Sequence, residues 1–123
     1  MKKIFLVMMG GSLGALCRYG VSLLAVKLCG NSFPWGTLLA NLSGCFLIGT
    51  FFALGERNIM DPSARLFFIT GFLGALTTFS AFALETMNAM YGGSNVIAGQ
   101  NFLFNNIGGM VMVFVGMWLG RML

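Results

Sequence analysis

Four long apolar stretches, separated by short polar segments, follow one another along the chain. They cover about residues 4–26, 35–54, 66–90 and 101–123. Each has close to the roughly 20 residues that an α-helix needs to cross the hydrocarbon core of a bilayer. The segments between them are too short for a soluble domain. The pattern therefore predicts one all-α integral membrane domain, residues 1–123, with four transmembrane helices.

The composition supports this class and excludes others. The chain is 58% hydrophobic and 8% charged, whereas a soluble domain has roughly 25% charged residues. It has no histidine, its three cysteines lack metal-binding spacing, and its acids are Glu56, Asp61 and Glu85. Such an inventory is too poor for a hydrolytic or redox site, so we predict that the protein is not an enzyme. The net charge of +4 is spread over loops and ends, which indicates membrane topology and not nucleic-acid binding.

The first apolar stretch follows Met1-Lys2-Lys3, a beginning similar to that of a signal peptide. No small-x-small cleavage site follows at the usual place, so we expect a retained span. Arg18 lies well inside this span, where a charge is expensive and by default indicates a functional site. The alternative is that its charge extends to the membrane surface or caps carbonyl groups near the helix end.

Glycine pairs at GxxxG spacing occur in two of the stretches, at Gly10 and Gly14 and at Gly116 and Gly120. Small residues let helices approach closely in lipid. A four-helix unit of this size can scarcely enclose a pathway alone, so we expect the protein to oligomerise through these glycines.

The second stretch has a polar face. Thr37, Asn41 and Gly44 are spaced i, i+4 and i+7, so they share one side of a helix. The amide of Asn41 needs hydrogen-bonding partners at membrane depth. It either lies beside a polar path or bonds to a neighbouring helix.

The third stretch is uncharged from Leu66 to Leu84, but its middle is poor helix-forming material. Gly, Thr and Ser have weak helix propensity, and they are concentrated at five positions: Gly71, Gly74, Thr77, Thr78 and Ser80. We therefore predict a helix broken at mid-membrane, with free carbonyls and hydroxyls facing something polar. Interrupted helices of this kind mark ion and substrate sites in transporters.

Phe79 and Phe82 directly follow this interruption and share one helix face. Because the edge of an aromatic ring is positive, two ring edges beside the Ser80 hydroxyl could hold a small, hard anion. The alternative is that they are two ordinary members of the thirteen phenylalanines in an apolar chain.

Other polar positions lie near the ends of the stretches. Asp61 before Pro62 predicts a helix N-cap. Glu85, on the face of Phe82, lies either at a pore mouth or at the membrane surface. A Gly- and Ser-rich loop is expected over residues 91–100, and Asn105 and Asn106 either line a vestibule or bond to neighbouring helices.

Three motifs in the first three stretches resemble, in order and spacing, those of the Fluc (CrcB) fluoride channels. They are Gly10-Gly-x-x-Gly-Ala-x-x-Arg18-Tyr19, Gly36-Thr-Leu-x-x-Asn41-x-x-Gly44-Cys-Phe-x-x-Gly49 and Gly71-x-x-Gly74-x-x-Thr77-Thr78-Phe79-Ser80-x-Phe82. The resemblance implies an antiparallel dimer with two pores, in the bacterial inner membrane as a multi-pass protein. Fluoride would leave the cytoplasm through these pores passively, down its gradient, which gives fluoride resistance.

The resemblance also implies roles for individual residues. The fluoride pore would be formed by Asn41, Phe79, Phe82, Ser80 and Thr78, with Arg18 near the aqueous vestibule. A structural sodium ion at the dimer interface would be bound by the backbone carbonyls of Gly74 and Thr77. Ala81 departs from members that have a hydroxyl residue at this place.

The distribution of basic residues allows two kinds of partner in the dimer. With four spans, one side of the membrane holds Lys2, Lys3, Arg57, Arg65 and Arg121, and the other holds Lys27. The positive-inside rule then favours a cytoplasmic N-terminus. An antiparallel homodimer would prefer no bias, so an oppositely oriented paralogue is an alternative partner to a second copy.

Two other functions are alternatives for a chain with four spans. A small multidrug-resistance-type cation/proton exporter also has four antiparallel spans, but it needs an acid in the first span, where this chain has Arg18. The second alternative is a non-transporting assembly subunit, in which Asn41, Thr77, Thr78 and Ser80 would serve only in helix packing.

Overall fold

The computed structural model describes all of residues 1–123, and it is entirely helical. The first two long helices are α1 (Lys2–Cys29) and α2 (Trp35–Glu56). The third is made of α3 (Pro62–Arg65), the π-helical η1 (Leu66–Leu73), α4 (Gly74–Leu76) and α5 (Phe79–Tyr91). The fourth is made of α6 (Asn95–Leu103), the π-helical η2 (Phe104–Gly108) and α7 (Gly109–Met122).

These four helices have the length and apolar character needed to cross a membrane. They cover residues 2–29, 35–56, 62–91 and 95–122, with mean hydropathy of 1.5 to 1.8. The prediction of four apolar helices is confirmed. Most large apolar side chains on them are exposed, as expected for a surface that meets lipid or other membrane helices.

One predicted loop is wrong. Residues 91–100 were expected to be irregular, but α6 begins at Asn95, inside this range. The glycine at position 99 is tolerated because α6 packs along α5 and buries Ala98 and Asn101. The predicted cap at the second loop is confirmed: Asp61 Oδ1 accepts a hydrogen bond from Ser63 N at 2.6 Å, and Pro62 opens α3.

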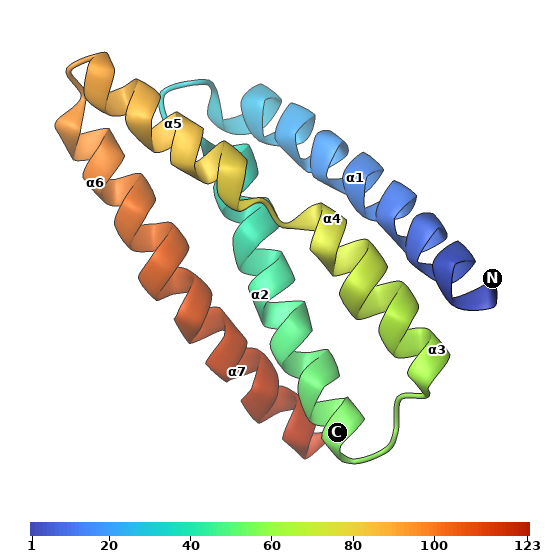
Figure 1. Ribbon diagram of the computed structural model, residues 1–123. Coiled ribbons are helices and arrows are strands. Elements are labelled where there is room, and N and C mark those ends of the chain that lie inside the picture. The colour runs from blue at the N-terminus through green and yellow to red at the C-terminus, as the bar shows by residue number, and fades with distance from the viewer.

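The third long helix changes its neighbours partway along. Its first half, η1 and α4, packs on α1, whereas α5 packs on α6 (Figure 1). α2 packs along α7 and contacts both halves. The N-terminus, α3 and the C-terminus lie toward the same end of the molecule (Figure 1).

The glycine pairs are used inside the chain. A Cβ at Gly10 or Gly14 would collide with the Phe67 or Phe72 carbonyl of η1, and one at Gly116 would collide with the Phe46 carbonyl of α2. The expectation that these glycines supply surfaces for oligomerisation is therefore wrong. A GxxxG pair predicts a close helix contact, but it does not say which helix is the partner.

Candidate functional site

Two residues of extended backbone separate α4 from α5. Thr77 has φ −80° and ψ 153°, and Thr78 has φ −150° and ψ 116°. Thr78 acts as the N-cap of α5, because its Oγ1 accepts a hydrogen bond from Ala81 N at 3.2 Å. The backbone N–H of Thr78 donates to Asn41 Oδ1 at 2.8 Å and not to its own helix. A side chain of α2 thus replaces the missing helical bond.

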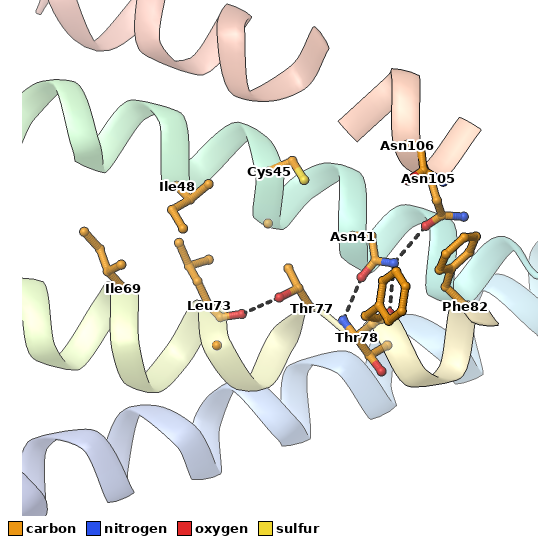
Figure 2. A pocket seen from close by; sticks show the side chains of 13 residues that line it. Asn41, Cys45, Ile48, Ile69, Leu73, Thr77, Thr78, Phe82, Asn105 and Asn106 are labelled. Carbon is orange, nitrogen blue, oxygen red and sulfur yellow. Dashed lines mark hydrogen bonds between the residues drawn. The ribbon is translucent and has the colours of Figure 1, made fainter. Parts of the chain in front are cut away.

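The amide of Asn41 joins three elements. Its Nδ2 donates to the Thr78 carbonyl at 3.1 Å and to Asn105 Oδ1 at 2.8 Å (Figure 2). Together with the bond accepted from Thr78 N, these contacts link α2, the extended segment and η2. Interhelical hydrogen bonding therefore occurs, and both N–H donors of Asn41 are occupied.

The hydrogen bonds continue from Asn105 to α5. Asn105 Nδ2 donates to Asn101 Oδ1 at 2.9 Å, and Asn101 Nδ2 donates to Thr86 Oγ1 at 2.9 Å. Asn101 is only 1% exposed. The sequence pattern does not single out Asn101, because this residue lies at the edge of the predicted fourth span. Its i, i+4 spacing to Asn105 is the signal that could have found it.

The two phenylalanines meet edge to face. Their ring centroids are 5.4 Å apart and their planes are inclined by 63°. They differ strongly in burial, since Phe82 is 5% exposed and Phe79 is 76% exposed. Phe79 therefore offers most of its ring to whatever covers this face of the chain.

A cavity of about 320 Å³ lies where these groups converge. Its walls come from α2, the first half of the third helix, the extended segment, the beginning of α5, and η2 (Figure 2). The predicted site residues that line it are Asn41, Gly74, Thr77, Thr78, Phe79 and Phe82. Asn105, Asn106 and Cys45 also line it. Most of its wall is apolar, and its polar groups are uncharged.

A second cavity, of about 550 Å³, lies on another side of the extended segment. It is lined by the remaining predicted residues, Arg18 and Ser80, and by Glu85. Thr78 lines both cavities, and its Oγ1 is 3.3 Å from Ser80 Oγ. The structure thus divides the predicted site residues between two cavities that share Thr78.

Glu85 turns toward α2. Its Oε1 accepts a hydrogen bond from the Thr37 hydroxyl at 2.6 Å, and its Oε2 is buried without a hydrogen-bonding partner. Arg18 lines the same cavity but forms no ion pair with Glu85, since the one salt bridge of the protein joins Arg121 to Glu56.

The backbone at the interruption has the chemistry of a hard-cation site. In a continuous helix, the carbonyl of Gly74 would accept from Thr78 N, and that of Thr77 from Ala81 N. These donors bond to Asn41 Oδ1 and Thr78 Oγ1 instead, so neither carbonyl has a hydrogen-bonding partner within the chain. Free carbonyl oxygens are ligands that sodium accepts, so these two residues fit such an ion.

Comparison with known proteins places this arrangement in a family. The family model described as CrcB-like protein, Camphor Resistance (CrcB), matches residues 5–117. The chain belongs to the CrcB family. The resemblance inferred from the three motifs is confirmed, and the four apolar helices of this CrcB-family chain are those of a multi-pass membrane protein.

Relatives in this family cover nearly the whole chain. A protein of Dehalococcoides mccartyi, named fluoride-specific ion channel FluC, is 43% identical over 100% of this chain and 95% of its own length. A protein of Salinibacter ruber with the same name is 44% identical over 94% of this chain and 87% of its own length. Another, from Shewanella amazonensis, is 40% identical over 97% of this chain and 96% of its own length.

Proposed function

We propose that the protein is a fluoride-specific ion channel that lets fluoride leave the bacterial cytoplasm passively and so gives fluoride resistance. The observation that supports this most directly is the convergence of Asn41, Thr78 and the Phe79–Phe82 pair on one neutral cavity, in a CrcB-family chain whose relatives are named fluoride channels. These names also agree with the prediction that the protein is not an enzyme. They do not favour the alternative of a multidrug-type exporter.

The chemistry of the first cavity suits fluoride. This ion is small and strongly hydrated, so a pore must replace its lost water with hydrogen-bond donors. The site must also bind weakly enough for the ion to leave. Neutral amide and hydroxyl donors together with positive ring edges meet both needs. Because both N–H groups of Asn41 are occupied, an arriving fluoride takes over one of them from Asn105 or from the Thr78 carbonyl.

The two cavities suggest an order along the path. The guanidinium of Arg18 attracts anions to the second cavity, which serves as the vestibule. Thr78 lines both this vestibule and the neutral cavity, and its hydroxyl is 3.3 Å from that of Ser80 in the vestibule. Fluoride then passes from these hydroxyls to Asn41 and the phenylalanine pair.

The functional unit is an antiparallel dimer with two pores, and the third helix of each copy is broken at mid-membrane. This is supported by the extended Thr77 and Thr78 and by the exposure of Phe79 and Gly74, which a second copy would cover. The partner is a second copy in the membrane, or an oppositely oriented paralogue, as the uneven distribution of basic residues also permits. The Gly74 and Thr77 carbonyls hold a sodium ion, which supplies fixed positive charge at the dimer interface.

The proposal is tested by fluoride efflux from liposomes that contain the purified protein alone, read with a fluoride electrode, with chloride release measured in parallel. We expect rapid release of fluoride without chloride. Phe79→Ala should abolish this release while the protein stays dimeric. Phe114→Ala is the matched control, because Phe114 is 74% exposed on α7 and lines neither cavity.

Two outcomes separate the parts of the proposal. No flux from well-folded protein alone, restored by a paralogue, would contradict the homodimer but keep the channel. No flux in either case, or equal release of chloride, would contradict the fluoride channel itself.

A further inference from the structure

A third cavity lies at the end of the molecule that holds the N-terminus. It is a groove of about 430 Å³ between the first turn of α1 and the beginning of the third long helix. Figure 1 shows these two segments at the same end of the molecule. Its walls are formed by Lys3, Pro62, Arg65, Leu66, Ile69 and Thr70. Two cations thus lie beside apolar side chains of a membrane-spanning helix, so the groove is itself amphipathic.

The two cations are available to a ligand. Neither Lys3 nor Arg65 forms an ion pair or a side-chain hydrogen bond within the chain. The acids of this end are engaged elsewhere: Asp61 caps α3, and Glu56 pairs with Arg121 at 3.9 Å. Neither cation of the groove is therefore paired with an acidic side chain.

One of these cations packs its side chain on α2. The guanidinium of Arg65 lies against Gly55 of α2, so closely that a Cβ at Gly55 would collide with it. Arginine carries planar donors that match the oxygens of a phosphate group, and Arg65 has no ion-pair partner to give up when a phosphate binds.

We propose that this groove, defined by Lys3, Arg65, Leu66 and Ile69, is a binding site for an anionic phospholipid. The phosphate lies between Lys3 and Arg65, and an acyl chain runs along Leu66 and Ile69 toward the membrane interior. Charge complementarity selects an anionic headgroup, and the apolar wall selects a lipid over a soluble phosphate. This site is independent of the fluoride path, since it shares no residue with the second cavity and only Ile69 with the first.

The test is native mass spectrometry of the purified protein in detergent, titrated with phosphatidylglycerol or with phosphatidylcholine. We expect phosphatidylglycerol to be retained in preference to phosphatidylcholine. Lys3→Gln and Arg65→Gln should each weaken its retention about fivefold, the effect of one basic residue near an anionic lipid. Lys3→Gln leaves the packing of Arg65 on Gly55 intact, so it tests the charge without disturbing the fold.

Two matched variants serve as controls. Lys2→Gln removes the same charge at the same end but outside the groove, and Lys27→Gln removes it at the other end of α1. Both should leave retention within about twofold of the wild type. An equal loss in Lys2→Gln would mean diffuse attraction and would overturn the site.

Three further outcomes would also overturn the proposal. The first is equal retention of the two lipids. The second is competition by glycerol 3-phosphate as effective as that by the lipid, which would assign the groove to a soluble phosphate. The third is a change of oligomeric state in Lys3→Gln without a change in lipid retention, which would assign it to a second copy.

Discussion

Two kinds of helix contact hold this protein together, and they are made of different chemical groups. Where α1 meets η1 and where α2 meets α7, glycines bring backbone against backbone. Where α2 meets η2 and where α5 meets α6, side-chain amides and hydroxyls form hydrogen bonds between the helices. We call the first kind the glycine contacts and the second the amide contacts.

This difference determines which contacts can exchange their hydrogen-bonding partners. Glycine contacts are made of closely packed helix backbone, and close packing tolerates little displacement. Amide contacts are hydrogen bonds, and each can be replaced by a bond of similar strength to water or to an anion. The proposed fluoride path lies along the amide contacts, whereas the glycine contacts hold the elements that flank it.

The largest effect should come from adding one methyl group to a glycine contact. Gly14→Ala places its Cβ against the Phe72 carbonyl, so α1 must move away from η1. We expect a loss of about 1–3 kcal/mol or more in the free energy of unfolding. Thermal unfolding in detergent measures this loss. Gly20→Ala on the same helix meets nothing within 4 Å and should be neutral or stabilising by up to about 1 kcal/mol.

The next effect separates folding from transport. Asn41→Leu removes the donor to Asn105 and leaves Thr78 N without its acceptor. We expect fluoride efflux to be lost, with a stability decrease of about 1–3 kcal/mol and the oligomeric state retained. Efflux and size-exclusion chromatography check this pair of results. A variant that conducts like the wild type would contradict the role of the amide contacts in transport.

A smaller effect is expected one step further from the cavity. Asn101 lines neither cavity but orients Asn105, so Asn101→Leu should reduce efflux about tenfold without abolishing it, a change of about 1.4 kcal/mol in the barrier. Asn88→Leu on the exposed face of α5, where the side chain makes no hydrogen bond, is the control. Equal rates in the two variants would mean that Asn105 needs no support.

The smallest effect concerns the bond between Thr37 and Glu85. Thr37→Val keeps the shape but removes the hydroxyl that donates to Glu85 Oε1. We expect a stability loss of about 0.5–1.5 kcal/mol, and efflux within a few fold of the wild type. Denaturation and efflux measured on the same preparation test this. Complete loss of efflux would mean that the bond between Thr37 and Glu85 is essential for fluoride transport.

The sequence was sufficient for the elements and for part of the site. Apolar length alone located the four helices, and Asp61 before Pro62 located a cap, because both depend on neighbouring residues only. The motif resemblance identified the family. Asn41 was singled out because an amide at membrane depth needs partners.

The predictions that failed depended on contacts between residues that are distant in the sequence. The bond from Asn41 to Thr78 spans 37 positions, and no local pattern gives its direction. Glycine spacing predicted close contacts at Gly14 and Gly116 but not that the partner belongs to the same chain. Asn101 was missed because its burial depends on α5, and the loop expected over residues 91–100 shortened for the same reason.

The extended segment also determines how the molecule can bend. No backbone hydrogen bond connects α4 with α5, because the donor of Thr78 is given to α2. The third long helix therefore consists of two halves with a joint at the extended segment. The first half packs on α1 and the second half packs on α6. We expect changes in bilayer thickness to be absorbed by a change of angle at this joint, which would leave the length and internal bonding of each half unaltered.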